Sequence, residues 1–246
     1  MRSNPAIPAI SLLLWAGMAV AQAQTPAPET APVPLGMLDD PCKGLEAGKL
    51  DWAGLCRYHD DNAALHGRPE LLLYGDSITE GWPRSDPAFF GTKIIGRGIS
   101  GQTSAQMLVR FHADVVALKP RRVLIMAGTN DVAGNLGPTS EQAWRDNIMA
   151  MVEIARAHGI EPVLASIPPA NRFGWRPGMQ PAARIASLNV WLRGYAKRQS
   201  LRYVDYYGVL VGEGGALKPE YGEDGVHPNA AGYAVMRPLA EALLKP

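Results

Sequence analysis

The sequence has little cysteine and little net charge. Its 246 residues include two Cys, and the formal net charge at pH 7 is +1. A charge so close to zero gives no basic surface for nucleic acid and no polybasic patch for an anionic membrane. No second pair of Cys or His residues stands at ligand spacing from the two cysteines, which disfavours a metal site. We therefore expect neither nucleic acid nor a metal ion as a partner.

The sequence also lacks an apolar stretch near its start that is long enough to cross a bilayer. Residues 10–20 (ISLLLWAGMAV) are apolar, but a membrane-spanning helix needs about 20 such residues. Arg2 precedes this stretch, and A-x-A cleavage sites that end at Ala21 and Ala23 follow it. These features predict a signal peptide over residues 1–23, with the choice between the two cleavage sites open. We expect a secreted or periplasmic protein without a stable membrane anchor, the alternative being an uncleaved signal anchor.

The predicted export decides the expected oxidation state of the two cysteines, because an oxidising compartment favours a disulfide. A bond between Cys42 and Cys56 would close a loop of about 15 residues and contribute about 3 kcal/mol. The alternative is two separate buried thiols. The bond would lie in an N-terminal extension over residues 39–69, which follows a Pro/Ala-rich linker over residues 24–38. We expect a helix over residues 52–65 of the extension.

From residue 70 to residue 246 short apolar runs alternate with amphipathic stretches. The runs predict five buried strands, over residues 71–74, 93–95, 122–126, 162–166 and 202–205. The stretches predict helices over residues 103–118, 139–158, 181–199 and 229–244, and Thr139 and Gln142 fit a capping box at the start of the second one. Alternating strands and helices are typical of an α/β domain with a parallel sheet covered on both faces.

Polar residues follow the strands at the points where such folds bind ligands. Ser77 lies in GDSIT after the first strand, Gly101 in ISGQT after the second, and Asn130 in GTND after the third. Asp224 and His227 lie in DGVHP after the last strand. Together they supply a nucleophile, a base with a carboxylate to orient it, and donors for an oxyanion. This set fits acyl transfer through a serine.

The four blocks, in this order, resemble those of the SGNH (GDSL-type) hydrolase family over residues 70–244. The resemblance implies a flavodoxin-like three-layer α/β/α sandwich around a five-stranded parallel sheet. It also implies an esterase that needs no metal or other cofactor. In such an enzyme Ser77, His227 and Asp224 are catalytic, and the oxyanion hole consists of the N–H groups of Ser77 and Gly101 and the amide of Asn130. The lysophospholipase-like and acetylhydrolase-like members are the most similar, so the expected substrates are short acyl esters, lysophospholipids or acetylated sugars.

Three further side chains are candidates for substrate contact. Trp82 follows the nucleophile, and Arg172 and Trp175 follow the fourth strand. Packing within loops is an equally good interpretation of all three. Asp76 and Asp131, in the first and third blocks, are expected to be turn residues without a catalytic role.

Two functions of other classes stay open. The stretch Gly96–Gly101 (GRGISG) fits the G-x-G-x-x-G pattern of dinucleotide-binding proteins, although it follows the second predicted strand and not the first. The chain could also be a carbohydrate-binding relative that has lost its chemistry. The partner expected for the enzyme is a small ester, and the sequence leaves the oligomeric state open.

Overall fold

The structure is a computed structural model that describes residue 42 and residues 51–245. The predicted signal peptide and linker lie outside these residues, and both stay predictions. Cys42 and Cys56 form a disulfide, as predicted.

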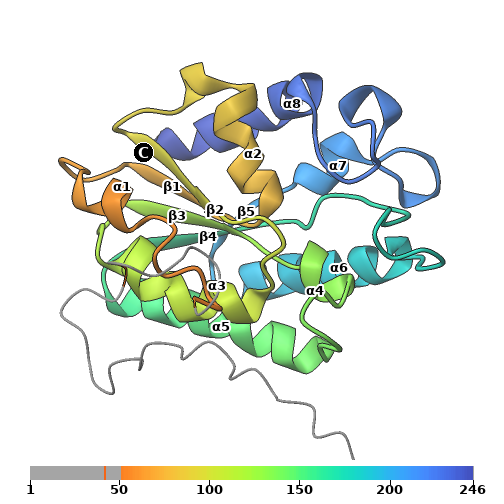
Figure 1. The fold of residues 1–246 in the computed structure, drawn as a ribbon, viewed down its shortest axis with the longest axis horizontal. Coiled ribbons are helices and arrows are strands. Elements are labelled where there is room, and N and C mark those ends of the chain that lie inside the picture. The colour runs from red at the N-terminus through yellow and green to blue at the C-terminus, as the bar shows by residue number, and fades with distance from the viewer. Residues whose placement is uncertain (1–41, 43–50, 246) are drawn as a thin grey trace, which may run out of the picture. The chain divides into compact units, whose positions relative to one another are not determined.

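Five parallel strands form one central sheet, in the order β2-β1-β3-β4-β5 (Figure 1). The strands are β1 (Leu71–Gly75), β2 (Ile94–Gly98), β3 (Arg122–Met126), β4 (Glu161–Ala165) and β5 (Arg202–Val204). The bounds of β3 are those predicted, whereas β2 runs three residues further than expected. β2 lies on one side of β1 and β3 lies on the other. The strand order therefore reverses beside β1. Ligands of α/β proteins bind at the carboxyl ends of strands at such a point.

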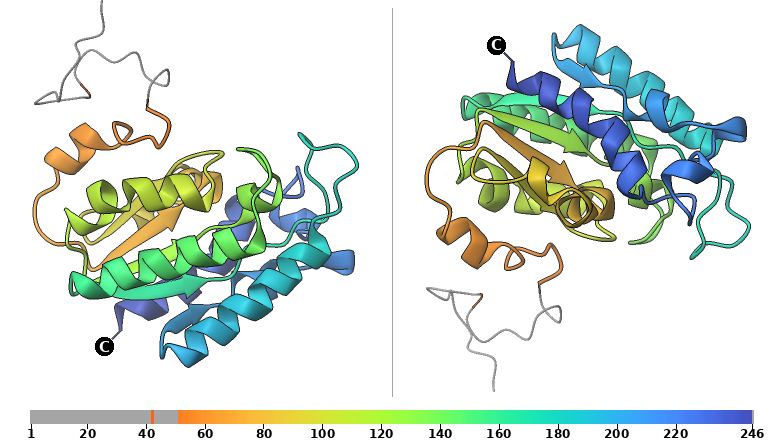
Figure 2. Two further views of the ribbon diagram at one scale, coloured as in Figure 1. Left: turned by 90° about the horizontal axis from the view of Figure 1, so that it is seen from below. Right: turned by 90° about the horizontal axis from the view of Figure 1, so that it is seen from above.

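Helices cover both faces of the sheet, so the predicted three-layer α/β sandwich is confirmed (Figures 1 and 2). One layer contains α2 (Ser77–Ser85), α7 (Tyr206–Leu210) and α8 (Ala230–Glu241). The opposite layer contains α3 (Ser104–Phe111), α4 (Thr129–Val132), α5 (Glu141–Ala157) and α6 (Ala182–Arg198). The short helix α1 (His59–Ala63) belongs to the N-terminal extension.

The core forms because β1 is apolar on both faces. Its side chains point alternately to the two layers. Leu71 and Leu73 pack in the cluster under α2 and α8, whereas Leu72 and Tyr74 pack in the cluster against α3, α5 and α6. Full burial of one such side chain contributes about 1.5–3 kcal/mol. The carboxyl end of β1 is thereby held between two packed layers.

Trp82 belongs to this core, and the prediction that it contacts substrate is wrong. Its side chain is 1% exposed and packs against Phe89, Tyr206 and Tyr233. The reason is helical spacing, since Trp82 lies one turn after the buried Ile78 on the inner side of α2.

Three predicted helices differ from the observed ones. In place of a helix over residues 52–65 there are turns followed by α1, because the carboxylate of Asp51 accepts hydrogen bonds from the N–H groups of Leu55 and Cys56 (both 2.7 Å). The helix predicted from residue 103 to 118 is α3 followed by a π-helical turn over His112–Val116. At the start of α5 the capping residue is Ser140, which accepts from Ala143 N–H, and not Thr139.

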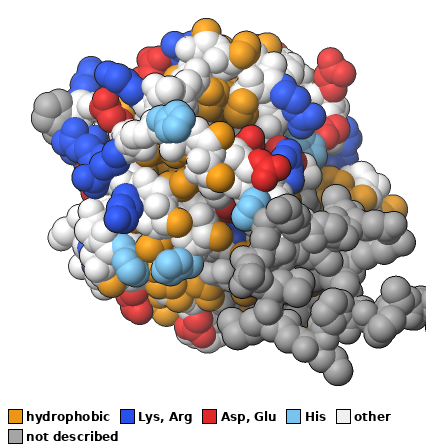
Figure 3. Space-filling model, turned by 60° about the vertical axis from the view of Figure 1, so that its left-hand side comes forward, with side chains coloured by type: hydrophobic (Ala, Val, Ile, Leu, Met, Phe, Trp, Pro, Cys, Tyr) orange, Lys and Arg blue, Asp and Glu red, His pale blue; other side chains and the backbone are white. Residues whose placement is uncertain are grey.

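The surface carries mixed charge. On the face in Figure 3, acidic and basic side chains lie among apolar and neutral ones. This mixture agrees with the near-zero net charge of the sequence. None of the helices in the described residues combines the length and the apolar character that a bilayer span requires.

Candidate active site

Ser77 lies at the junction of β1 and α2, as the first residue of the helix. The preceding residue, Asp76, caps the helix by accepting a hydrogen bond from Ile78 N–H (3.0 Å). The N–H groups of a first helical turn have no partner within the helix and carry its positive end charge. Ser77 is half-buried and lies at the carboxyl end of β1, where ligands of α/β proteins bind.

Asp224 and His227 form one hydrogen-bonded turn just before α8. Asp224 Oδ1 accepts from the N–H groups of Val226 and His227 (both 2.8 Å), which fixes the backbone of the turn. Its second oxygen, Oδ2, lies 2.6 Å from His227 Nδ1. The side chains remain open to solvent, 54% exposed for Asp224 and 39% for His227. One carboxylate therefore orients both the turn and the imidazole.

The structure brings Ser77 and His227 together across 150 residues of sequence. Ser77 Oγ lies 2.8 Å from His227 Nε2. Because Nδ1 faces a carboxylate, which is an acceptor, Nδ1 carries the proton and Nε2 is free to accept one from Ser77. Burial acts to raise the pKa of Asp224, but hydrogen bonds from the side chain and backbone of His227 and from Val226 outweigh it, and the pKa lies below its usual value.

Gly96 and Gly98 are strand residues of β2 and do not lie in a turn. A Cβ on Gly98 would lie 2.2 Å from Glu80 N and 2.6 Å from Asp76 O, so only glycine lets β2 approach the start of α2. Gly101 lies in the loop after β2 with φ of +77°, the region that glycine adopts without strain. The dinucleotide-binding interpretation loses its geometric basis, because that motif requires its glycines in the turn that opens a helix.

Asn130 lies in α4, the short helix after β3, and its side chain is buried. Its Nδ2 donates to Gln102 O (3.0 Å), next to Gly101 in the chain, and to Asp76 Oδ2 (3.2 Å), next to Ser77. One side-chain amide thus connects the residues adjacent to the other two predicted oxyanion donors. The three predicted donors come from the ends of β1, β2 and β3, which are neighbours in the sheet.

Asp76 was expected to be a turn residue, and it is also a buried carboxyl group at the base of the site. It is 2% exposed. Burial raises its pKa to about 6, while the hydrogen bond from Ile78 N–H and the nearby His227 act to lower it and Asp131 acts to raise it. Asp131 is not a plain turn residue either, since its carboxylate accepts from the N–H (2.9 Å) and hydroxyl (2.5 Å) of Ser104 at the start of α3.

A buried arginine that the sequence analysis missed lies under the same strand ends. Arg110, on α3, donates to Gly75 O (2.9 Å) and to Arg97 O (3.1 Å), and it pairs with Asp114 at 2.8 Å. Neither charged side chain has any exposed surface. The Nε of Arg110 also donates to the Gln102 side chain. Arg110 therefore fixes the carboxyl ends of β1 and β2 and the loop after β2. The i,i+4 spacing of an Arg and an Asp was the one sequence signal for it.

The other two candidates for substrate contact lie on the loop between β4 and α6. Trp175 is 43% exposed and stacks on the buried Phe173, and its ring centroid is 6.4 Å from that of His227. Arg172 is exposed and its side chain lies near Gly225, in the turn that holds His227. Trp175 thus borders the candidate site, whereas Trp82 does not.

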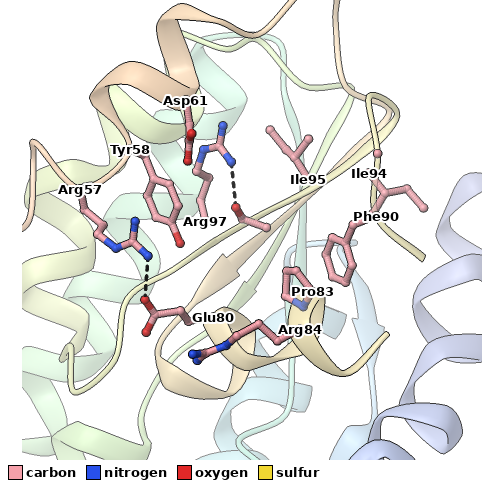
Figure 4. Close-up of a pocket in the computed structure, with 12 residues that line it drawn as sticks. Arg57, Tyr58, Asp61, Glu80, Pro83, Arg84, Phe90, Ile94, Ile95 and Arg97 are labelled. Atoms are coloured by element: carbon pink, nitrogen blue, oxygen red, sulfur yellow. Dashed lines mark hydrogen bonds and ion pairs between the residues drawn. The ribbon is translucent and has the colours of Figure 1, made fainter. Parts of the chain in front are cut away.

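A cavity of about 390 Å³ lies between α1, β2 and α2, and none of Ser77, Asn130 or His227 lines it (Figure 4). In its wall Arg57 pairs with Glu80 (3.2 Å). Glu80 also accepts from the N–H of Ser100 (2.9 Å), the residue before Gly101. Burial acts to raise the pKa of Glu80, but these contacts leave it below its usual value. Glu80, in the wall of this cavity, therefore supports the loop of Gly101 from outside the site.

No group of three or more His, Cys, Asp or Glu side chains in the described part of the chain could hold a metal ion. A hydroxyl within hydrogen-bond distance of an imidazole, at the strand ends of an α/β sandwich, is the arrangement that acyl-transferring hydrolases use. Comparison with known proteins gives the same class, that of carboxylic ester hydrolases.

Comparison with family models identifies one family within this class. The model of the GDSL-like lipase/acylhydrolase family matches residues 73–235, well over half of the chain. The chain belongs to this family. The match includes every residue predicted for catalysis and for the oxyanion hole, but the disulfide lies before it.

The chain is also similar to individual solved structures and curated proteins. A solved GDSL-like lipase from Bacteroides thetaiotaomicron VPI-5482 has 45% sequence identity and a TM-score of 0.75, and the match covers 78% of this chain and 97% of that one. Thioesterase 1/protease 1/lysophospholipase L1 of Escherichia coli (strain K12) is 29% identical over 65% of this chain and 75% of that protein. The uncharacterized lipoprotein YqeF of Bacillus subtilis (strain 168) is 39% identical over 42% of this chain, and the match spans half of the length of that lipoprotein.

Proposed function

We propose that the protein is an extracytoplasmic serine esterase that hydrolyses carboxylic esters through an acyl-enzyme intermediate. The observation that carries the proposal is the continuous hydrogen-bonded path from Ser77 Oγ to His227 Nε2 (2.8 Å) and from His227 Nδ1 to Asp224 (2.6 Å). A path of this kind lets an imidazole take the serine proton during attack and lets a carboxylate stabilise the imidazolium that results.

In the acylation step, Ser77 Oγ attacks the carbonyl carbon of the ester while its proton moves to His227 Nε2. The carbonyl oxygen becomes an oxyanion, which accepts hydrogen bonds from the N–H groups of Ser77 and Gly101 and from Asn130 Nδ2. When the tetrahedral intermediate collapses, the bond to the alcohol oxygen breaks, and His227 gives its proton to the leaving alcohol. In the resting structure Asn130 Nδ2 donates to Gln102 O and Asp76. We infer that the longer bond, to Asp76, weakens as the oxyanion forms.

In the deacylation step, His227 takes a proton from water, and the hydroxide attacks the acyl carbon. Ser77 then leaves with that proton, and the carboxylic acid is released. The same three donors stabilise the second tetrahedral intermediate.

For the substrate we propose a small ester with a short acyl chain, with lysophospholipids and acetylated sugars as the other members of the test panel. The lysophospholipase name of the relative from Escherichia coli supports the inclusion of lysophospholipids. For the location we propose the periplasm or the exterior of the cell, which the Cys42–Cys56 disulfide and the lipoprotein relative support.

The test is hydrolysis of p-nitrophenyl acetate, together with covalent labelling by a fluorophosphonate probe, for the wild type and for Ser77→Ala. Loss of the nucleophile should lower kcat by at least about 10³-fold and abolish labelling. Ser85→Ala is the matched control, because Ser85 is the exposed last residue of the same helix. It should hydrolyse and label like the wild type.

A Ser77→Ala variant that labels and turns over like the wild type would overturn the assignment of the nucleophile. A wild-type protein with no activity on any ester of the panel would favour the non-catalytic, carbohydrate-binding alternative.

A further inference from the structure

The loop between β4 and α6 binds tightly to the loop that follows Asn130. Trp175 Nε1 donates to Asn135 Oδ1 (3.0 Å). Next to it, Arg176 donates from Nε to Ala133 O (3.0 Å) and from a terminal nitrogen to Gly134 O (2.9 Å). Trp175 was expected either to contact substrate or to pack within its loop, and Asn135 was not among the predicted site residues. These bonds give Trp175 a partner within the protein as well as a place beside His227.

Asn135 extends this contact to the candidate oxyanion hole. Its Nδ2 donates to Asn130 Oδ1 (2.6 Å). Asn130 Nδ2 in turn donates to Gln102 O and to Asp76 Oδ2. A single chain of hydrogen bonds therefore runs from the partly exposed indole of Trp175 to the buried base of the site.

The chain has a fixed direction, because an indole N–H only donates. Asn135 must present its oxygen to Trp175 and is left with its NH₂ for Asn130. Asn130 must then present its oxygen to Asn135, so its own NH₂ points toward Asp76 and the loop of Gly101. At the far end, the carbonyl of Gln102 only accepts, which agrees with the same direction. A side-chain amide is nearly symmetric in shape, so this polarity, and not packing, decides which end of Asn130 faces the reaction.

We propose that Trp175 and Asn135 are positioning residues, which hold the amide of Asn130 with Nδ2 toward the substrate carbonyl oxygen. The inference rests on the proposed function of Asn130 as an oxyanion donor. A reversed amide would present an oxygen to the developing negative charge and would repel it. Simple packing does not account for Trp175, because 43% of its side chain is exposed.

Two substitutions test the direction of the chain. Trp175→Phe keeps an aromatic ring over Phe173 but removes the N–H, and it should lower kcat by about 3- to 10-fold, the scale of one net hydrogen bond. Asn135→Asp still accepts from Trp175 but cannot donate, so Asn130 should turn its NH₂ toward the new carboxylate. This variant should lower kcat by about 10²- to 10³-fold, the loss expected for one oxyanion donor. KM should change less than about threefold in both, because the interaction develops in the transition state.

Controls separate this role from a structural one and from an effect of charge. Trp52→Phe changes another exposed tryptophan and should leave kcat unchanged. Asn135→Leu removes both hydrogen bonds without adding charge, and its kcat should lie between those of the wild type and Asn135→Asp. Adding Trp175→Phe to Asn135→Asp should lower kcat by less than Trp175→Phe does alone, because the two residues act through one amide.

The positioning role is overturned if Trp175→Phe and Asn135→Asp keep kcat within twofold of the wild type, or if they lower it only in parallel with the thermal unfolding temperature. If Ser77→Ala is inactive while both of these variants keep wild-type kcat, only the positioning inference fails. If Ser77→Ala keeps its activity, the proposed function fails first.

Discussion

The candidate site joins two regions that the chain builds in opposite ways. Asp224 and His227 lie in a four-residue turn whose hydrogen bonds are local and whose side chains are largely open to solvent. The donors of the candidate oxyanion hole lie over a buried polar network, in which Asp76, Asn130 and Arg110 have at most 3% of their surface exposed. That network connects three strand ends that are far apart in sequence.

This difference means that the effect of a charged group on the free energy of unfolding and its effect on the reaction rate can be separated. A charge in an exposed turn contributes little to stability, because water screens it and solvates it well. A charge in the buried network must be paired, because a buried unpaired charge is strongly destabilising. Substitutions in the turn should therefore affect mainly the rate, whereas substitutions of the buried ion pair Arg110–Asp114 should affect mainly folding.

The largest effect is expected from Asp224→Asn, which should lower kcat/KM for p-nitrophenyl acetate by about 10⁴-fold, the scale known for an imidazole held in the wrong tautomer. The asparagine NH₂ would donate to His227 Nδ1, so the ring proton moves to Nε2 and His227 can no longer accept from Ser77. Asparagine Oδ1 can still accept from the backbone of the turn. The free energy of unfolding should therefore change by at most about 1 kcal/mol.

The measurements are steady-state kinetics and urea unfolding of the same sample. Glu223→Gln changes the exposed acid next to Asp224 and serves as the control, with wild-type values expected in both measurements. A variant at Asp224 that unfolds much more easily while it keeps its activity would contradict the comparison.

The next largest effect is expected from Arg110→Met, which should lower the free energy of unfolding by about 3–5 kcal/mol. The substitution leaves Asp114 fully buried without its cation and removes donors from Gly75 O and Arg97 O. Chemical unfolding at neutral pH measures the loss. The double variant Arg110→Met with Asp114→Leu should recover part of it, since no unpaired charge remains.

The comparison variant is Arg237→Met, which breaks a partly exposed ion pair of the same i,i+4 spacing with Glu241 and a second pair with Asp86. It should unfold at the wild-type midpoint. Equal losses for Arg110→Met and Arg237→Met would show that burial does not set the difference between the two regions.

The same contrast explains which parts of the site the sequence could predict. Asp224 and His227 interact through a turn three residues apart, so their pairing is visible in DGVHP itself. The sheet was predictable for a similar reason, because a short apolar run with β-branched residues, such as RVLIM at Arg122–Met126, favours a buried strand.

The buried network was not predictable in this way. Asp131 has the composition of a turn residue, yet it binds the start of α3, and Asn135 reaches Asn130 only because the loop of Trp175 folds over it. Trp82 follows the nucleophile closely in the sequence, as a substrate contact could, but its place on the inner side of α2 buries it in the core. Each of these outcomes depends on which elements meet in space, and no local pattern records that.

The smallest effect to be tested is the pH dependence of stability, in which the two regions should have opposite signs. Burial raises the pKa of Asp76 from 3.8 to about 6. At pH 5 the folded protein therefore holds a proton on Asp76 that the unfolded chain has lost. The stability that this group contributes is complete below pH 3.8 and is lost as the pH rises through 6. The loss is about 3 kcal/mol for a shift of this size. Asp224, whose pKa is lowered, contributes stability above its unfolded pKa that is lost as the pH falls.

Urea unfolding at intervals between pH 2 and pH 7 measures both signs. Asp76→Asn cannot ionise, so the difference in free energy of unfolding between wild type and variant should fall by about 3 kcal/mol from pH 2 to pH 7. Asp131, whose pKa burial also raises, is present in both proteins, so only the part of its titration that depends on the nearby Asp76 remains in this difference. The corresponding difference for Asp224→Asn should instead increase with pH, and it should do so below about pH 4, because the pKa of Asp224 is lowered from 3.8. If both differences moved in the same direction, the buried carboxyl group would have to be stabilised in its charged form, as the exposed one is. The two regions would then not differ in how they hold charge.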